Sequence, residues 1–286
     1  MTNMFLNDSD DLFDIRRDRI FKAVFTHDTP DSRGALSKLI SALICRNVTI
    51  INLTVNEPPV DRLGERHIRF DINCIVENGE PVNIEISLNP KPFEPVKLEY
   101  YSGKLFTGQD IQRSEKTYDD LKQSYQIAIL AEKQFFPDQV FLHNFEYYDH
   151  INQMPLNGRS RIITVELSKL DQVIEKPVKE TNSQERWAVF FEYLTNKGKR
   201  GKINEIIAQE EGIAMALKIL HTISKDQAER WRQISEEKYE LDKRSELAYE
   251  RQIAKQEGKL EGRQEIIDLL KSGKSLEEII KEYGAQ

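Results

Sequence analysis

Two short stretches decide the fold: IRFDINCIV (residues 68–76) and VNIEISL (residues 82–88). In each stretch, apolar side chains occupy every second position, and the residues between them are mostly polar. This alternation is typical of a β-strand with one apolar and one polar face. The sequence ENGE (77–80) between them favours a turn, so we expect a β-hairpin.

The pairing of this hairpin determines which side chains meet. Directly opposed residues face the same side of a sheet, so even-numbered positions must pair with even-numbered ones. This requires a loop with an odd number of residues or a bulge, and the loop glycine suits either. With Val76 placed opposite Val82, Asp71 faces Ser87, and Glu85 is its diagonal neighbour. We therefore expect Asp71, Glu85 and Ser87 together on the polar face.

Helical and extended patterns surround this hairpin in the first part of the chain. Apolar residues recur at helical spacing in 16–25, 34–45 and 96–109, whereas 48–55, 126–130, 140–147 and 161–167 are strand-like. Long apolar strands indicate a sheet whose faces are covered by helices. Residues 1–175 are thus expected to form an α/β domain with a mixed sheet flanked by helices.

Residues 176–286 have a different character. They carry 21 basic and 21 acidic residues, so the whole net charge of −7 comes from residues 1–175. In 226–263 the charged residues often lie four apart, which favours a solvated helix. We expect a charged helical C-terminal extension over 176–286. Its alternating charges favour helix pairing, so self-association into a homo-oligomer through these helices is a further expectation.

Composition excludes several classes of protein. No run approaches the roughly 18 apolar residues of a membrane span, so no membrane partner is expected. The two cysteines are too few for a disulfide framework, and a reducing, cytoplasmic setting is the default expectation. A net charge of −7 argues against tight binding of nucleic acid through bulk charge alone. Any binding of nucleic acid should therefore be local and salt-sensitive, or absent.

Asp71 and Glu85 are candidate metal ligands. Mg²⁺ prefers hard oxygen ligands and usually keeps several waters, so two or three carboxylates suffice to hold it. Asp18, on the expected first helix, is a candidate third acid. The alternative interpretation is that polar hairpin faces often carry acids, and acidic residues are abundant in this chain. From spacing alone, both interpretations stay open.

Several short motifs carry a resemblance to a known family, in the same order along the chain. They are DRIFKAVF (18–25), the strand around Asp71, NIEI (83–86), Lys97 three residues before a Tyr-Tyr pair, and IITVELSKL (162–170). Together they resemble the Rpn family, recombination-promoting nucleases also called PD-(D/E)XK nuclease family transposases. The resemblance spans nearly the whole chain, and the joint order of the motifs is more specific than any one of them.

The resemblance implies a restriction-endonuclease-like fold and cleavage of DNA that depends on Mg²⁺, with Mn²⁺ as a substitute. On this view the protein is an endonuclease that hydrolyses phosphodiester bonds and promotes recombination. Asp71 and Glu85 would bind the metal, and Asp18 would assist directly or through water. Two residues beyond Glu85, the superfamily has Lys and this family commonly Gln, but this chain has Ser87. Lys97 is then the best candidate for the missing positive charge.

The serine at position 87 also supports a second hypothesis. Ser has a shorter reach than Lys or Gln and no charge, so it is a poorer stabiliser of developing negative charge. The chain would then be a catalytically degenerate protein that keeps the nuclease fold for DNA binding, regulation or oligomeric interaction. Restoring Lys or Gln at this position distinguishes the two hypotheses.

Overall fold

The computed structural model describes residues 5–54, 70–109, 116–275, 277, 279 and 281. The chain divides into two compact units, Met1–Lys225 and Asp226–Gln286. The first two residues of the expected strand 68–76 lie outside the described residues.

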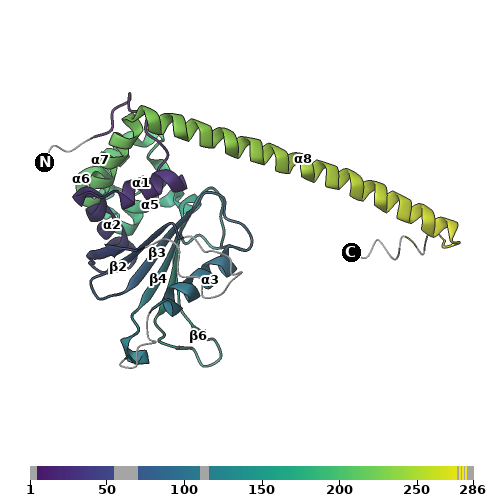
Figure 1. Ribbon diagram of the computed structural model, residues 1–286, viewed down its shortest axis with the longest axis horizontal. Helices are drawn as coiled ribbons and strands as arrows, with labels where there is room; N and C mark the ends of the chain where they lie inside the picture. Colours follow the sequence, from purple (N-terminus) through teal and green to yellow (C-terminus); the bar gives the residue numbers. More distant parts are fainter. Residues whose placement is uncertain are drawn as a thin grey trace. The chain divides into compact units, whose positions relative to one another are not determined.

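Six strands form one mixed sheet in the first unit, in the order β1-β2-β3-β4-β8-β5 (Figure 1). They are β1 (Ile50–Leu53), β2 (Ile72–Val76), β3 (Pro81–Ser87), β4 (Ser124–Leu130), β5 (Leu142–Phe145) and β8 (Ser160–Glu166). β3, β4 and β8 run parallel, whereas β1, β2 and β5 pair antiparallel with their neighbours. A separate small sheet joins β6 (Tyr148–Asp149) to β7 (Met154–Pro155). The expected mixed sheet is confirmed.

The described residues of this unit also form helices on both faces of the sheet. They are α1 (Asp18–Thr26), α2 (Pro30–Leu43), α3 (Glu94–Thr107), α4 (Asp171–Glu175), α5 (Ser183–Tyr193), α6 (Arg200–Gln209) and α7 (Glu211–Lys225). Short 3-10 helices are η1 (Tyr118–Asp120), η2 (Leu167–Lys169), η3 (Val178–Glu180) and η4 (Lys197–Lys199).

The loop between β2 and β3 has the odd length that parity requires. Residues 77–79 form the loop, and the Val76 amide closes it by donating to the Glu80 carbonyl at 3.0 Å. Gly79 adopts φ +76°, a left-handed conformation that glycine enters without steric cost. Even-numbered positions therefore pair with even-numbered ones, as the sequence predicts.

The register of the hairpin differs from the expected one by two residues. Cys74, not Val76, lies opposite Val82, because the strands pair from the first residue of β3 onward. Continuing this register by one residue beyond the pair Ile72–Ile84 brings Asp71 opposite Glu85 itself. The two carboxylates are thus closer neighbours than the predicted diagonal arrangement.

The two faces of the sheet are covered by different helices. Ile84 and Ile127 point into a large apolar core that they share with α1, α2 and α5–α7. On the opposite face, Leu98 of α3 packs on Ala128 and Leu130 of β4. The polar face of the hairpin therefore lies under α3, and Glu85 there is only 4% exposed.

Helix α1 buries one face and leaves the other for the polar residues of the DRIFKAVF motif. Its Phe21 and Phe25 rings are 5.0 Å apart and fully buried, and Phe25 also packs against Trp187 of α5 at 6.1 Å. Apolar residues at i and i+4 give such a helix one buried stripe. Asp18 and Lys22, also four apart, lie outside that stripe and form an ion pair.

The structural division does not coincide with the expected boundary after residue 175. Helices α5, α6 and α7 follow that residue, yet their apolar side chains share the core of the first unit. The reason is that the amphipathic stripe of α7, with Ile213 and Leu217 fully buried, packs against α2. The first unit therefore extends to Lys225.

The second unit contains α8 (Gln227–Lys271), a helix of 45 residues. Most of its described apolar side chains are exposed, including Leu247, Tyr249 and Leu260. This agrees with the solvated, charged helix that the sequence predicts. None of the helices in the described residues is both long and apolar enough to cross a lipid bilayer.

Candidate active site

Main-chain amides hold the carboxylates of Asp71 and Glu85 in place. The Asp71 amide donates to Glu85 Oε1 at 3.1 Å, and the Ile86 amide donates to Asp71 Oδ2 at 3.0 Å. These reciprocal bonds follow from the register of β2 and β3, which places the two residues opposite each other. One oxygen of each carboxylate is therefore fixed by an amide.

The second oxygen of each carboxylate faces a lysine. Lys22 Nζ of α1 lies 2.9 Å from Asp71 Oδ1, and Lys97 Nζ of α3 lies 3.4 Å from Glu85 Oε2. Helix α3 begins at Glu94 with a proline in its first turn, where proline's fixed φ suits the helix, so Lys97 enters the site from that first turn. The structure thus places Lys97, the candidate for the missing positive charge, next to Glu85.

Asp18 does not touch the carboxylate pair in any contact that the structure records. Its Oδ1 lies 2.7 Å from Lys22 Nζ, and its side chain is 57% exposed. Lys97 has a similar second partner, since its Nζ lies 3.2 Å from Glu94 Oε1. The expected third acid is thus linked to Asp71 through Lys22.

Two buried amides extend the site beneath α3. Asn83 Nδ2 donates to Glu85 Oε1 at 3.1 Å and to Gln126 Oε1 at 2.8 Å, and both amide side chains are fully buried. These residues, together with Lys22 and Glu94, are parts of the site that sequence reasoning missed. A signal was present, because a polar residue at a core position of an apolar strand needs a hydrogen-bonding partner.

The electrostatics of the site favour a bound cation. Burial raises the pKa of Glu85 to about 7, and the Asp71 carboxylate adds to the rise. Burial and the Asp18 charge raise the pKa of Asp71 above its ordinary value, against the opposing hydrogen bonds from Lys22 and the Ile86 amide. Both carboxylates therefore carry unfavourable negative charge that a cation would stabilise.

The two lysines stay protonated despite their partial burial. Burial acts to lower the pKa of Lys22, but hydrogen bonds to Asp18 and Asp71 raise it above the ordinary value. For Lys97, burial again acts to lower the pKa, and the charges of Glu85 and Glu94 outweigh it. The site thus contains two ammonium groups at neutral pH.

The donor set fits a hard divalent cation held by few protein ligands. No cluster of three or more His, Cys, Asp or Glu suited to a metal occurs among the described residues. A Mg²⁺ ion, however, usually takes one or two carboxylates and completes its shell with water and substrate phosphate. Asp71 Oδ1 and Glu85 Oε2 are the oxygens not held by the backbone, and they are the ones that would bind it.

Ser87 lies on the same face of β3 as Glu85, two residues further along the strand. It carries no charge, so it supplies no ammonium group to the site. The ammonium groups at this end of the sheet come instead from α1 and α3, through Lys22 and Lys97. The site therefore contains positively charged groups even though residue 87 is a serine.

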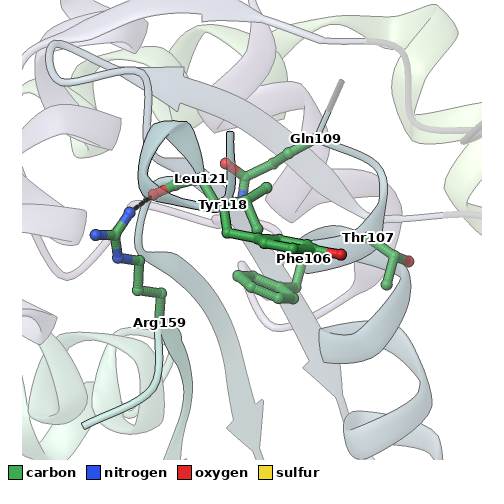
Figure 2. A pocket seen from close by; sticks show the side chains of 6 residues that line it. All are labelled: Phe106, Thr107, Gln109, Tyr118, Leu121 and Arg159. Carbon is green, nitrogen blue, oxygen red and sulfur yellow. Dashed lines mark hydrogen bonds between the residues drawn. The ribbon is translucent and has the colours of Figure 1, made fainter. Parts of the chain in front are cut away.

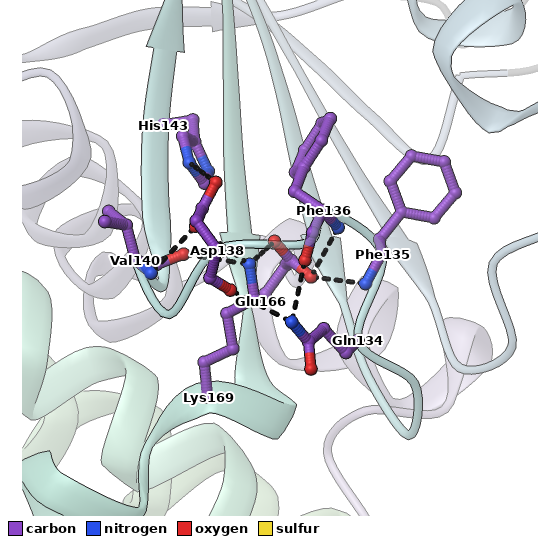
Figure 3. A network of polar contacts seen from close by, with 8 residues as sticks. All are labelled: Gln134, Phe135, Phe136, Asp138, Val140, His143, Glu166 and Lys169. Atoms are coloured by element: carbon purple, nitrogen blue, oxygen red, sulfur yellow. Dashed lines mark hydrogen bonds and ion pairs between the residues drawn. The ribbon is translucent and has the colours of Figure 1, made fainter.

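A second buried ion pair, formed by Glu166 and Lys169, stabilises the fold (Figure 3). Glu166 accepts the amides of Phe135 and Phe136 at 2.5 and 3.2 Å, and its other oxygen lies 2.5 Å from Lys169 Nζ. Asp138 lies 3.2 Å from the same ammonium. This network fastens the loop after β4 to the end of β8, and its hydrogen bonds occupy both Glu166 oxygens.

A pocket near the other end of α3 is separate from the candidate site (Figure 2). Its lining residues are Phe106, Thr107, Gln109, Tyr118, Leu121 and Arg159. The Arg159 guanidinium donates to the carbonyls of Asp119, at 2.8 Å, and of Leu121. Its charged group is therefore already engaged by the backbone, and none of the predicted site residues lines this pocket.

Comparison with protein families gives a match over most of the chain. The family model described as "PD-(D/E)XK nuclease family transposase" matches residues 15–250. That range contains Asp18, Lys22, Asp71, Glu85 and Lys97. No curated protein and no solved structure matches the chain.

The raised pKa of Glu85 predicts how the stability of the protein without added metal varies with pH. The folded carboxyl titrates at about 7, above the ordinary 4.5, so the folded state binds a proton more tightly than the unfolded state. Its contribution to stability is present below about pH 4.5 and is lost as the pH rises to about 7. Wild type should therefore lose stability over this window relative to Glu85→Gln, measured by urea unfolding at several pH values.

The matched control is Glu99→Gln, which removes an exposed carboxylate from the same helix as Lys97. Its stability should follow that of wild type at every pH. A constant difference between wild type and Glu85→Gln from pH 4.5 to 7 would contradict the raised pKa.

Proposed function

Because the chain belongs to the PD-(D/E)XK nuclease family transposases, we propose that it is a metal-dependent endodeoxyribonuclease that hydrolyses phosphodiester bonds of DNA. The observation that carries this proposal is the carboxylate pair: Asp71 and Glu85 are clamped by backbone amides, and each turns its second oxygen to a lysine. Carboxylates and ammonium groups in one site suit a reaction in which a cation and a phosphate must be held together.

The proposed ligands are Asp71 Oδ1 and Glu85 Oε2, with Mg²⁺ as the cation and Mn²⁺ as a substitute. When bound, such an ion activates water and stabilises the charge of the phosphodiester during hydrolysis. The amides of Asp71 and Ile86 keep the two carboxylates in place before the ion arrives. This preorganisation lowers the cost of binding, because the side chains are already ordered.

Lys97 is proposed to stabilise negative charge on the phosphate. Its ammonium lies over the Tyr101 ring, 5.3 Å from the centroid, and between two carboxylates at 3.2 and 3.4 Å. The Phe70 ring packs edge-on against Tyr101 at 5.6 Å and so supports that position. A fixed ammonium can stabilise charge that develops in the transition state without reorganising first.

Further aspects of the function rest on the family and the sequence. DNA is the proposed substrate, and promotion of recombination is the proposed role. Binding should be local, because the first part of the chain is acidic overall. A cytoplasmic location and self-association through α8 stay predictions of the sequence.

Nicking of supercoiled plasmid DNA tests the proposal. Asp71→Asn and Glu85→Gln should each lower the Mg²⁺-dependent rate by about 100-fold or more, since a bound metal supplies several kcal/mol of transition-state stabilisation. Glu99→Gln, which neutralises an exposed carboxylate on α3, should cleave like wild type. Equal nicking by all four proteins would show that the activity comes from a contaminant or another site.

The degenerate protein remains the second candidate because of Ser87. If the lysines of α1 and α3 supply the charge, wild type cleaves and Ser87→Lys changes the rate by less than about tenfold. If the site has degenerated, wild type is inactive and Ser87→Lys or Ser87→Gln creates Mg²⁺-dependent cleavage. Comparing the three proteins in the plasmid assay decides between the two candidates.

A further inference from the structure

The oxygens that would bind a divalent cation are already in contact with ammonium groups. Lys22 Nζ lies 2.9 Å from Asp71 Oδ1, whereas Lys97 Nζ lies 3.4 Å from Glu85 Oε2. The first distance is that of a charge-assisted hydrogen bond, and the second is longer than one. Lys22 is therefore the lysine that directly occupies a ligand oxygen.

A metal ion and the Lys22 ammonium compete for Asp71 Oδ1. A Mg²⁺ ion binds oxygen at about 2.1 Å, so it would stand within a few ångströms of an ammonium that stays at hydrogen-bond distance. Two cations at that separation, in a site where Asp71 is largely buried, repel each other strongly. This repulsion favours departure of the ammonium from Asp71 when the ion binds.

The structure offers Lys22 a second place. Asp18 Oδ1 already lies 2.7 Å from Lys22 Nζ, one helical turn away on α1. The Asp18 side chain is 57% exposed, compared with 14% for Asp71, so an ammonium paired with Asp18 alone remains well solvated. A small rotation of the Lys22 side chain thus exchanges a buried partner for an exposed one without leaving a charge unpaired.

The charge balance agrees with this exchange. The connected groups are four carboxylates and two ammonium groups, namely Asp18, Asp71, Glu85, Glu94, Lys22 and Lys97. With all six ionised their sum is −2, which one divalent cation neutralises. The two lysines therefore neutralise half of the negative charge of the four carboxylates. The remaining charge of −2 is the charge that one divalent cation would neutralise.

We propose that Lys22 is a resident counter-cation of Asp71, which moves onto Asp18 when a divalent cation binds. Asp18 is then a positioning residue that raises the affinity for the ion without touching it. This inference rests on the proposed function only in that the ion binds Asp71 and Glu85. It differs from the expectation that Asp18 is itself a ligand, directly or through water.

A double-mutant cycle on Mn²⁺ affinity tests the proposal, with calorimetry on the full-length protein in the absence of DNA. Lys22→Met should bind Mn²⁺ at least about threefold more tightly than the control Lys104→Met. The control removes an ammonium group from a different helix, α3. Asp18→Asn should bind at least about threefold more weakly than Glu99→Gln. Thermal melts of each variant verify that it is folded.

The decisive result is the coupling between the two residues. If Asp18 acts by receiving Lys22, then Asp18→Asn should have no effect, within about a factor of two, in the Lys22→Met background. An equal loss in both backgrounds would overturn the proposal, because Asp18 would then act as a ligand or by its charge alone. Equal affinities of Lys22→Met and Lys104→Met would also overturn it.

Wild type and Asp71→Asn separate this inference from the proposed function. If Asp71→Asn removes Mn²⁺ binding but Lys22 and Asp18 show no coupling, the proposed metal site is supported and the exchange of Lys22 is rejected. Absence of Mn²⁺ binding by wild type would reject both.

Discussion

Two hydrogen bonds from main-chain amides to the carboxylates of Asp71 and Glu85 determine the rest of the site. The Asp71 amide holds Glu85 Oε1, and the Ile86 amide holds Asp71 Oδ2. Each bond fixes one carboxylate through the main chain of the strand that carries the other. The carboxylates therefore cannot move apart unless the hairpin itself shifts its register, and a shift by one residue would turn one of them toward the apolar core.

This constraint places two like charges in a poorly solvated position, and the surrounding residues offset the cost. Lysines from α1 and α3 pair with the free oxygens, and each lysine has a second carboxylate, Asp18 or Glu94. Helix α1 can deliver Lys22 because its phenylalanines anchor the opposite face in the core. The core of the first unit, including α5–α7, thus supports the chemistry indirectly by fixing where α1 lies.

Much of this architecture could be predicted from the sequence. The alternation in 68–76 and 82–88 and the parity of the loop were sufficient to place Asp71 and Glu85 on one face. The sequence did not determine the exact register. The observed pairing, with a three-residue loop and an earlier start of β3, differs from the expected pairing by two residues and places the same side chains on each face. Periodicity defines faces, but it does not distinguish between registers of the same parity.

The residues that sequence reasoning missed depend on tertiary contacts. Lys22 lies within the quoted motif 18–25, but only the packing of α1 brings its ammonium to Asp71. Gln126 reads as the start of an ordinary strand, and its contact with Asn83 comes from the parallel pairing of β3 and β4. The end of the first unit at Lys225 likewise follows from the packing of the apolar stripe of α7 on α2. The charged stretch 226–263 begins directly after this residue, but the sequence alone did not show that α5–α7 share the core of the first unit.

The central claim is that Asp71 and Glu85 hold a divalent cation between them. Anomalous diffraction from crystals soaked in Mn²⁺ tests it most directly. We expect one anomalous peak within about 2.2 Å of both Asp71 Oδ1 and Glu85 Oε2, with the Lys22 ammonium no longer on Asp71. A peak at another site would contradict the proposed metal site, whereas an unchanged Lys22–Asp71 contact beside a peak at Asp71 and Glu85 would reject only the exchange of Lys22.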